Sequence, residues 1–505
     1  MNFSWHTRVL LAVGSGVALA LSFPNYNLWP LAWAAVGMLV LASFGARPAS
    51  APIYGFLHGL VFCPICLPWI DTVMRQYGSV DPWSSAGILG LIGVAVGVIC
   101  SAFSWAVALA SKRSNAFACA LAPFLWVTLE FARTHLPIIG FPWNLTGYAA
   151  SESLALLQLT SLTGIYGLSF IIAAYSSLAA YAMLAHTNRG WKAMVVVTAM
   201  LVLIVSGGRY FIRGATPQYT AHLVQTNFAQ SEHYSADWLN IHAGELNALE
   251  RISIDAARKT PGLIIWPEVP APFSMQEPSF AGRARRIARD SGSEFLVGVV
   301  DWKQEASGTW IATNSAVLLD PSARRIFTYD KIHLVPFGEY VPLRHWLTFA
   351  GRLTADISDF TPGSVYRVGM LPEGNFGAFI CYEAIFPGEV RRFTAGGAEL
   401  LINISNDGWF GRSSAPAQHL MMARVRAVEN RRWLLRDTNN GFTVAVDPYG
   451  RVVARLPADT RGELDAPYSF RSDLTVYARF GDWFAWLCLI ASMLGVGAAM
   501  AMRAR

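Results

Sequence analysis

The chain has 505 residues, of which 53% are hydrophobic and only 14% are charged, and its formal net charge is +6. So few charged residues exclude an ordinary soluble protein of this length. The basic excess does not call for nucleic acid, because the sequence has no basic stripe interleaved with aromatic residues, and membrane topology with anionic lipid explains it.

Long apolar segments fill the first 210 residues and return near the C-terminus. A helix needs about 20 apolar residues to span a bilayer. Eight segments approach that length: 8–24, 28–46, 54–73, 86–111, 116–135, 163–186, 192–208 and 482–502. The sequence therefore predicts a polytopic α-helical membrane domain with seven spans over 1–212, and an eighth span with a short tail over 480–505. Pro64, Pro68 and Pro123 predict kinks in the third and fifth segments.

The first apolar segment has some features of a cleaved signal peptide. Arg8 precedes the apolar stretch, and the small-residue sequence Ala18-Leu19-Ala20 follows it. The positive end is thin, however, and more spans follow, so we expect a retained helix.

The basic residues between the segments predict the orientation of the chain. Cytoplasmic loops are enriched in Lys and Arg. With a cytoplasmic N-terminus, the inside segments carry Arg8, Arg47, Lys112, Arg113, Arg189, Lys192, Arg503 and Arg505, whereas the short outside loops carry Arg75 and Arg133. Seven spans then place the region after residue 212 on the outer side of the membrane, which is the periplasm for a bacterial inner membrane. Miscounting one span, most easily the proline-bearing third one, would invert this orientation.

The region 217–470 resembles a globular domain in composition. Apolar runs typical of strands lie at 221–227, 262–268, 294–300, 314–320, 324–330, 377–383 and 399–405, and helical patterns lie at 237–258, 279–290 and 416–430. Short continuous apolar runs indicate strands that are covered on both faces. Their alternation with helices predicts a layered α/β domain.

Cys381 is the only cysteine of this domain, and the other five lie in the proposed spans. Buried cysteines in helices usually behave as small hydrophobic residues. An extracytoplasmic cysteine normally has a disulfide partner, so an unpaired one is either buried and inert or a free thiol kept for its reactivity. The residue pattern alone leaves both interpretations open.

A nucleophilic cysteine needs a base for its proton and a cation or donors for the oxyanion. The histidines of this domain stand in uninformative contexts. Glu268 and Lys331 each follow an apolar strand, where functional groups collect in α/β sheets. Each residue alone is better explained as an exposed charge at the domain rim, and only the three residues together favour a catalytic site. The chain has no zinc-type Cys-His spacing, no GxGxxG after a strand and no phosphate-binding loop.

Three motifs resemble those of the nitrilase superfamily, whose members use a Glu-Lys-Cys triad on an αββα sandwich. They are WPE (266–268), YDKIHLVPFGEYVP (329–342) and ICYEAIFP (380–387). The motifs SNDGWFG (405–411) and LLRDTNNG (434–441), together with the flanking spans, make the whole chain similar to the apolipoprotein N-acyltransferase family. The lysine and cysteine motifs are long and specific, whereas WPE alone is weak.

The resemblance implies roles for the triad. Cys381 would be the nucleophile, Glu268 the general base and Lys331 the residue that stabilises the oxyanion. Glu339, eight residues after Lys331, matches a second family glutamate that orients the lysine or the amine.

Three further residues match positions of the family. The backbone N–H of Tyr382 would be an oxyanion donor, and Glu383 would brace the loop. Trp238 matches a tryptophan that the family needs for activity, although a core or interface aromatic explains it equally well.

The resemblance also implies the chemistry and the partners. A fatty acyl chain would pass from a phospholipid to Cys381 as a thioester, and then to the α-amino group of a diacylglyceryl-modified N-terminal cysteine of an apolipoprotein. No cofactor, metal or nucleic acid is implied, and because one chain carries a full triad we expect a monomer. The segments 138–148 and 345–360, Trp409, Phe410 and Arg352 could contact the lipids, but both segments are explained equally well as interfacial anchors.

Two other functions are possible for a chain with these features. A membrane-anchored amidase or hydrolase would use the same triad with water as acceptor, but such an enzyme has no need of eight spans. A polytopic carrier or scaffold would tolerate loss of the thiol and would favour charges within the membrane. The proposed spans carry few such charges, among them Asp71 and Glu130, and both lie near span ends.

Overall fold

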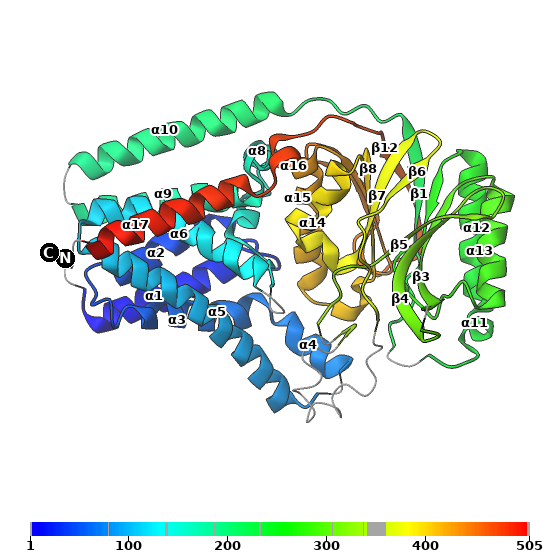
Figure 1. The fold of residues 1–505 in the computed structure, drawn as a ribbon, viewed down its shortest axis with the longest axis horizontal. Coiled ribbons are helices and arrows are strands. Elements are labelled where there is room, and N and C mark those ends of the chain that lie inside the picture. Colours follow the sequence, from blue (N-terminus) through cyan, green and yellow to red (C-terminus); the bar gives the residue numbers. More distant parts are fainter. Residues whose placement is uncertain are drawn as a thin grey trace. The chain divides into compact units, whose positions relative to one another are not determined.

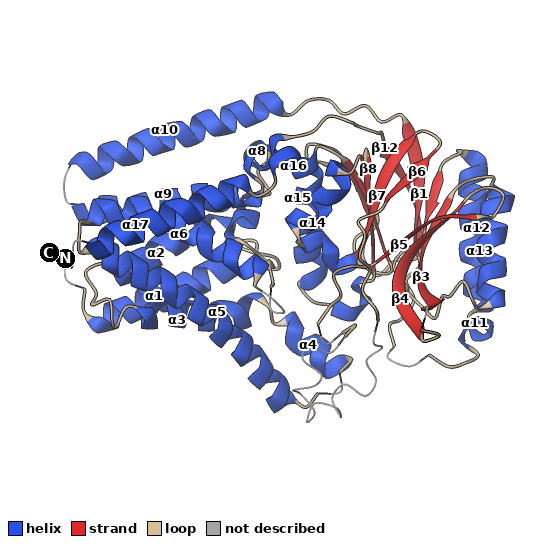
Figure 2. Cartoon of the chain, in the orientation of Figure 1, coloured by secondary structure: helices blue, strands red, loops and turns tan. Residues whose placement is uncertain are grey.

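The structure, a computed structural model, describes residues 3–78, 80–136, 140–185, 188–231, 234–305, 307–336, 338–340 and 360–501. The chain forms two compact units. The helical unit comprises 1–75, 80–213 and 480–505, and the sheet unit comprises 76–79 and 214–479. All described strands belong to the sheet unit (Figures 1 and 2).

Nine helices of eight residues or more form the described part of the helical unit. They are α1 (Trp5–Leu21), α2 (Ala32–Ser43), α3 (Pro52–Cys66), α4 (Trp69–Gln76), α5 (Pro82–Ser111), α6 (Asn115–His135), α9 (Ile165–Ala185), α10 (Asn188–Phe211) and α17 (Trp483–Ala501). The shorter helices α7 (Leu154–Leu157) and α8 (Thr160–Thr163) precede α9. The predicted polytopic helical architecture is confirmed.

Five of the described helices are long and apolar enough to cross a membrane: α5, α6, α9, α10 and α17. A sixth span results if α3 and α4 are counted as one. The first two predicted segments correspond to apolar helices shorter than 18 residues. Prolines lie at the ends of both, because α1 ends before Pro24 and α2 begins only after Pro30, and a proline lacks the N–H that would extend the helical ladder.

The third predicted segment is broken, as its prolines indicate. Helix α3 ends at Cys66 and α4 begins at Trp69, and the two helix axes are bent by 57°. Pro68 lies in the gap and lacks the N–H that would continue the helical ladder, whereas Pro64 is tolerated inside α3. Such a bent pair is either one broken span or a re-entrant segment.

Helices α3 and α5 approach each other closely through small residues. A Cβ added to Gly59 of α3 would lie 2.4 Å from the backbone nitrogen of Gly97, and one added to Gly55 would lie 2.0 Å from the carbonyl oxygen of Cys100. Both helices carry glycines four residues apart, the spacing that lets membrane helices pack backbone to backbone.

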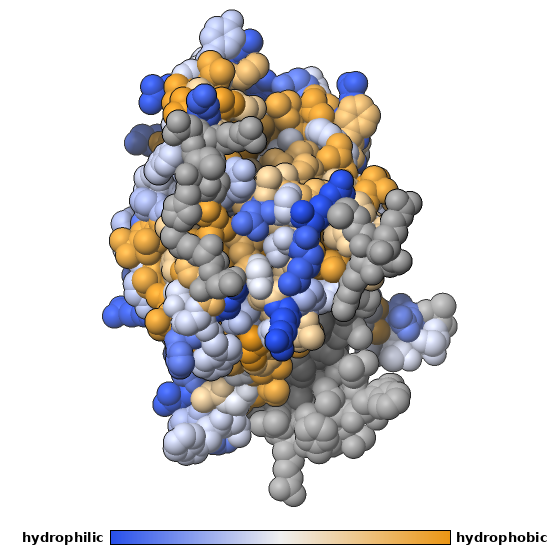
Figure 3. All heavy atoms as spheres, turned by 90° about the vertical axis from the view of Figure 1, so that its left-hand side faces the viewer, coloured by the Kyte–Doolittle hydropathy of each residue, from blue (hydrophilic) through white to orange (hydrophobic). Residues whose placement is uncertain are grey.

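The surface of the helical unit is largely apolar. Side chains such as Trp191, Val195 and Leu203 on α10 and Met493 and Leu494 on α17 are more than half exposed. Figure 3 shows hydrophobic side chains spread over much of the face that carries both chain ends, with hydrophilic groups between them. Water would strongly disfavour so many exposed apolar side chains, so lipid is the solvent of this unit.

The loop after α6 is packed down within the helical unit. Trp143, Asn144 and Tyr148 are almost fully buried, and Glu130 of α6 accepts a hydrogen bond from the Thr146 N–H at 2.7 Å. Residues 143–148 of the predicted lipid-contacting segment 138–148 are therefore fixed against the helical unit. The other segment, 345–360, and Arg352 lie outside the described residues except for Phe360.

Two six-stranded sheets form the centre of the sheet unit. The first has the order β12-β1-β2-β3-β4-β5, and the second has the order β11-β10-β9-β8-β7-β6. The strands of the first sheet are β1 (Tyr219–Gln225), β2 (Leu263–Ile265), β3 (Phe295–Gln304), β4 (Trp310–Leu319), β5 (Arg325–Asp330) and β12 (Gly462–Tyr468). Those of the second sheet are β6 (Val368–Leu371), β7 (Gly374–Ile380), β8 (Leu400–Ser405), β9 (Trp433–Thr438), β10 (Val444–Val446) and β11 (Val452–Arg455).

Helices cover the outer faces of both sheets and complete an αββα sandwich. Helices α11 (Trp238–Ile241), α12 (Ala243–Lys259) and α13 (Pro278–Ser291) lie beside the first sheet, and α14 (Pro387–Ala395) and α15 (Ala415–Asn430) lie beside the second (Figure 1). The buried runs of β2 and β8 explain this arrangement, because each strand is covered on both faces. The predicted layered α/β fold is confirmed.

The strand directions bring polar side chains to one end of the sandwich. Strands β1, β2 and β3 run parallel, as do β7, β8 and β9. The carboxyl ends of neighbouring parallel strands meet at the same sheet edge. Residues that follow β2, β5, β7 and β8 in the sequence therefore converge at that end.

Candidate active site

Three strand ends supply the predicted triad. Glu268 follows β2, Lys331 follows β5 directly, and Cys381 follows β7 directly. All three side chains are buried, with no more than 6% of their surface exposed. Burial of a carboxylate and an ammonium is unfavourable unless they are paired, so their partners define the site.

Lys331 lies between two carboxylates. Its Nζ is 3.0 Å from Glu268 Oε1 and 2.9 Å from Glu339 Oε1. Burial lowers the pKa of Lys331, but the charges of Glu268 and Glu339 outweigh burial and hold the pKa well above its ordinary value. The ammonium therefore stays protonated and can serve as a fixed positive charge.

Cys381 interacts electrostatically with both Glu268 and Lys331. Burial, followed by the charge of Glu268, raises the pKa of the thiol, and Lys331 only partly opposes that shift. The resting thiol thus keeps its proton. A thiol in this state needs a base at the moment of attack, and the nearby Glu268 carboxylate can act as that base.

The backbone at Cys381 is in the left-handed region, with φ of +49°. This conformation is disfavoured for residues other than glycine and persists only where the surroundings fix it. It turns the chain from β7 into the 3-10 turn η4 (Cys381–Ile385). The sharp turn sets the nucleophile apart from the strand, on the side where Glu268 and Lys331 converge.

Glu383 ties the cysteine turn to the lysine loop. Its Oε1 accepts hydrogen bonds from the Tyr329 hydroxyl at 2.7 Å, the Ile332 N–H at 2.8 Å and the His333 N–H at 3.1 Å, while Oε2 accepts from the Ile380 N–H at 2.7 Å. Burial and the neighbouring Glu389 raise the pKa of Glu383 to about 7. The bracing role expected of Glu383 stays a prediction, which these four hydrogen bonds make specific.

Sequence reasoning missed Asn314, which orders both glutamates. The Asn314 amide donates to Glu268 Oε1 at 2.7 Å and to Glu339 Oε1 at 2.8 Å. The backbone N–H of Asn406 donates to the other oxygen of Glu268 at 2.8 Å. An asparagine within a predicted strand carries no local signal of this role, although Asn406 stands in the motif SNDGWFG.

His419, whose sequence context is uninformative, also lies at the site. It is fully buried on α15, and its Nε2 lies 3.1 Å from the Cys381 carbonyl oxygen. Its contacts with Asp407, Arg436 and Cys381 span 12, 17 and 38 residues, so no local pattern could indicate its position.

Two other predicted residues lie in aromatic surroundings. Trp238 stacks on His242 with ring centroids 4.1 Å apart and meets Phe228 edge to face. It belongs to the hydrophobic core beneath the first sheet. Tyr382 is buried, and its ring contacts His333 and Phe386. A catalytic role for the Trp238 side chain stays a prediction, and the core role is visible in these contacts.

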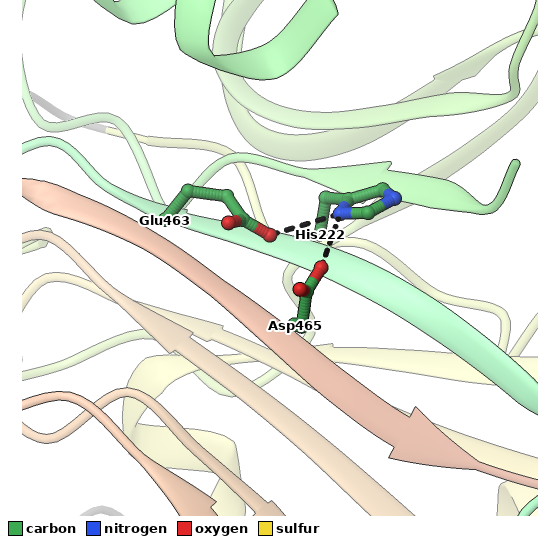
Figure 4. A group of neighbouring side chains, drawn as sticks. All are labelled: His222, Glu463 and Asp465. Atoms are coloured by element: carbon green, nitrogen blue, oxygen red, sulfur yellow. Dashed lines mark hydrogen bonds and ion pairs between the residues drawn. The ribbon is translucent and has the colours of Figure 1, made fainter. Parts of the chain in front are cut away.

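One group of described residues has the composition of a metal site. His222 of β1 faces Glu463 and Asp465 of β12, with Nδ1 at 2.9 and 3.1 Å from their carboxylate oxygens (Figure 4). Its Nε2 lies 2.7 Å from the Thr260 carbonyl oxygen, so that nitrogen carries a proton. The carboxylates and the carbonyl outweigh burial and raise the pKa of His222. A protonated imidazolium satisfies all three acceptors, and we interpret the group as an ion pair.

The sheet unit belongs to the carbon–nitrogen hydrolase class. The sequence model described as "Carbon-nitrogen hydrolase" matches residues 216–470. A second model, "Apolipoprotein N-acyltransferase N-terminal domain", matches residues 15–178.

Curated relatives extend over nearly the whole chain. The chain is 36% identical to "Apolipoprotein N-acyltransferase" of Geobacter metallireducens over 98% of its length and 95% of that protein. It is 33% identical to the protein of that name from Bradyrhizobium diazoefficiens, over 100% and 97% of the two chains. The chain therefore belongs to the apolipoprotein N-acyltransferase family and is an N-acyltransferase.

Solved structures similar to this chain cover about half of it. An amidase of the nitrilase superfamily from Nesterenkonia AN1 is 20% identical, with a TM-score of 0.39 over 52% of this chain and 94% of the amidase chain. Nit3 of Saccharomyces cerevisiae is 17% identical, with a TM-score of 0.38 over 50% and 90% of the two chains.

Proposed function

We propose that the enzyme transfers a fatty acyl chain from a phospholipid to the α-amino group of the diacylglyceryl-cysteine at the N-terminus of an apolipoprotein, through a thioester on Cys381. The observation that carries the proposal is the position of Lys331, which directly follows β5 and is held between Glu268 and Glu339 by two short ion pairs. This arrangement supplies a base and an oxyanion-stabilising cation without a histidine. The names of the relatives supply the acceptor class.

In the first half-reaction, Glu268 takes the thiol proton while the sulfur attacks the ester carbonyl carbon of the phospholipid. The negative charge that develops on the carbonyl oxygen is stabilised by the Lys331 ammonium and by the Tyr382 N–H. The carbon–oxygen ester bond then breaks. The departing alkoxide takes the proton from Glu268, and a lysophospholipid leaves the acyl thioester behind.

In the second half-reaction, the free α-amine of the lipoprotein attacks the thioester carbonyl carbon. Glu268 takes a proton from the amine nitrogen, and Lys331 again stabilises the oxyanion. The carbon–sulfur bond breaks, and the thiolate recovers a proton from Glu268. An ester and an amine have become an alcohol and an amide, and the enzyme is returned to its starting state.

Glu339 keeps the lysine in place for both half-reactions. Its Oε1 accepts from Lys331 at 2.9 Å and from Asn314 at 2.8 Å, and its Oε2 accepts from the Val335 N–H at 2.8 Å. Glu268 also accepts three hydrogen bonds, but its charge acts on the Cys381 thiol, so we assign proton exchange to Glu268 and the holding of the ammonium to Glu339. This division supports separate roles for the two glutamates.

The apolar helices suit an enzyme whose substrates are lipids. Pulling an acyl chain out of a bilayer into water costs roughly 0.8 kcal/mol per CH₂ group. An enzyme anchored in the membrane avoids most of that cost. The distribution of Lys and Arg supports a periplasmic catalytic domain on a bacterial inner membrane, and the complete set of catalytic side chains in one chain supports a monomer.

Intact-protein mass spectrometry tests the first half-reaction. The full chain, in detergent or nanodiscs, is incubated with phospholipid vesicles and no acceptor. We expect one added fatty-acyl mass, removable by hydroxylamine and absent from the Cys381→Ser variant. Peptide mapping should find Cys119, a buried cysteine of α6, unmodified in the same sample. A folded wild-type chain that stays unmodified would contradict the proposal.

Glu268→Gln keeps the shape of the general base but cannot accept the thiol proton, so we expect it to block loading. If Cys381 of this variant were acylated at the wild-type rate, Glu268 would be excluded as the base. The rival function is a hydrolase that uses water as acceptor. It predicts that Cys381 is acylated and then releases free fatty acid, even when a diacylglyceryl-cysteine peptide is present as acceptor.

A further inference from the structure

His419 makes a hydrogen bond to the peptide that follows the nucleophile. Its Nε2 lies 3.1 Å from the Cys381 carbonyl oxygen, and both groups are buried. A carbonyl oxygen only accepts hydrogen bonds, so Nε2 must carry a proton. The mechanism above does not use this contact.

The other side of the ring faces a buried ion pair. His419 Nδ1 is 3.1 Å from Asp407 Oδ1 and 3.2 Å from Arg436 Nη2. Burial, and then the Arg436 guanidinium, hold the pKa of His419 below its usual value, so the ring is neutral at pH 7. A neutral ring with its proton on Nε2 leaves Nδ1 as an acceptor for the guanidinium.

The ion pair itself is fixed by the two motifs that the triad leaves unexplained. Arg436 of LLRDTNNG donates from Nη2 to both oxygens of Asp407 of SNDGWFG, at 3.0 and 2.8 Å. Ser405 also donates to Asp407, at 2.8 Å. A Cβ added to Gly441 would lie 2.2 Å from Asp407 Oδ2, so this position needs glycine for the close approach. Both motifs therefore serve to hold one carboxylate and one guanidinium against His419.

The Cys381 carbonyl and the Tyr382 N–H belong to the same planar peptide. A donor on the carbonyl oxygen therefore fixes the direction of the N–H, and it also polarises that N–H, because hydrogen bonds along a chain strengthen one another. The need for such a support is evident from the left-handed φ of +49° at Cys381, which the strand alone would not maintain.

We propose that Arg436, Asp407 and His419 form a relay that orients and polarises the Cys381–Tyr382 peptide, so that the Tyr382 N–H stabilises the oxyanion. His419 is thus a positioning residue and not a base for the thiol. The inference rests on the proposed function, because the role of His419 is defined for acyl transfer at Cys381.

Two amide side chains separate the relay from a general structural role. In His419→Gln, the amide nitrogen reaches the position of Nε2 and can still donate to the Cys381 carbonyl. In His419→Asn, the shorter side chain reaches only the position of Nδ1, so the contacts with Asp407 and Arg436 are retained and the donor to the carbonyl is lost. Both variants place a polar amide in the same buried site.

Two reactions of Cys381 are measured on each variant of the full chain in nanodiscs. Acylation, from vesicles of phosphatidylethanolamine and phosphatidylglycerol or from p-nitrophenyl butyrate, passes through an oxyanion. Alkylation by iodoacetamide uses the same sulfur and forms none. We expect His419→Asn to lower the acylation kcat about 10- to 100-fold, less than direct removal of an oxyanion donor, with a nearly unchanged KM. His419→Gln should stay within about fivefold of wild type, and alkylation should be unchanged in both.

A matched pair of variants controls for the loss of a buried histidine. His222 is equally buried, and its Nε2 also meets a backbone carbonyl, that of Thr260. His222 contacts Thr260, just before the amino end of β2, whereas Glu268 follows the carboxyl end of that strand. His222→Gln and His222→Asn should therefore be acylated at the same rate.

Three results would overturn the inference. The first is equal acylation by the folded Gln and Asn variants of His419, and the second is acylation and alkylation that fall together. Wild type that reacts with neither acyl donor would overturn both the inference and the proposed function. Reaction with the nitrophenyl ester alone would refute the phospholipid donor, while the Gln and Asn comparison on that ester would still decide the inference.

Discussion

The Asn314 side-chain amide donates a hydrogen bond to Glu268 Oε1 at 2.7 Å, and the same nitrogen lies 2.8 Å from Glu339 Oε1. Lys331 bridges the same two oxygens from Nζ. The amide and the ammonium together give each carboxylate oxygen two donors. This pairing explains how two buried carboxylates can lie close together without excluding one another.

Asn314→Asp should therefore inactivate the enzyme. The new carboxylate would face Glu268 and Glu339 as an acceptor, and the three negative groups would compete for one lysine. We expect the acylation rate to fall by at least about 100-fold, because a repelled or protonated Glu268 no longer serves as the base. Rapid-quench mass spectrometry of Cys381 measures this rate.

Asn314→Ala is the control for that charge. It removes the donor without adding a negative group, so a milder loss, of about tenfold, is expected. Equal losses in the Ala and Asp variants would show that charge repulsion is not the cause.

Glu383→Gln should destabilise the sheet unit as well as slow the reaction. The glutamine can present only one oxygen, so its NH₂ group would face either the Ile380 N–H or the three donors of the lysine loop. A buried clash of this kind costs about 1–3 kcal/mol, which thermal unfolding followed by circular dichroism detects.

Glu389→Gln provides the comparison for Glu383. Glu389 pairs with His333 at the edge of the same cluster and is partly exposed. Its loss removes a charge that raises the pKa of Glu383, so the midpoint of unfolding should change little. A larger loss of stability in Glu389→Gln than in Glu383→Gln would contradict the bracing role.

Gly59→Ala should loosen the packing of α3 against α5. The added methyl group would lie 2.4 Å from the backbone nitrogen of Gly97, so the helices must move apart. Such overpacking costs about 1–3 kcal/mol and should lower the midpoint of thermal unfolding in detergent. Gly90→Ala on α5 is the control, because its Cβ would meet nothing within 4 Å. A similar shift in both variants would refute the close approach.

The contribution of His222 to stability should depend on pH. Its pKa is raised in the folded state, so the ion pair with Glu463 and Asp465 stabilises the protein fully below about pH 6.5. That stability is lost as the pH rises through the folded-state pKa. His222→Gln should lower the midpoint of thermal unfolding more at pH 5.5 than at pH 9. An equal lowering of the midpoint at pH 5.5 and pH 9 would contradict the ion pair. A large change in the wild-type midpoint on addition of EDTA would also contradict it.

The sequence predicted much of the sheet unit because its apolar runs are local signals. The strands expected at 377–383 and 399–405 correspond to β7 and β8, and the helix expected at 416–430 corresponds to α15. Strand ends also carry information, since Glu268, Lys331 and Cys381 each follow a strand in the structure. Burial patterns and turn positions of this kind are encoded within a few residues.

Other features depend on partners that are remote in the sequence. Asn314 and Glu268 are 46 residues apart, and His419 and Cys381 are 38 apart. No spacing rule connects such pairs, because the fold alone brings them together. In the helical unit, hydropathy located the apolar segments, but it did not predict the lengths of α1 and α2, which end or begin near prolines.

The decisive experiment for the thioester on Cys381 follows one acyl group from the cysteine to an amine. Wild-type enzyme is loaded from vesicles that contain an isotopically labelled acyl chain, freed of donor, and mixed with a diacylglyceryl-cysteine peptide. We expect the label to leave Cys381 and to appear, in equal amount, as an amide on the peptide N-terminus. Labelled amide formed by Cys381→Ser, or label released from wild type only as free fatty acid, would contradict this expectation.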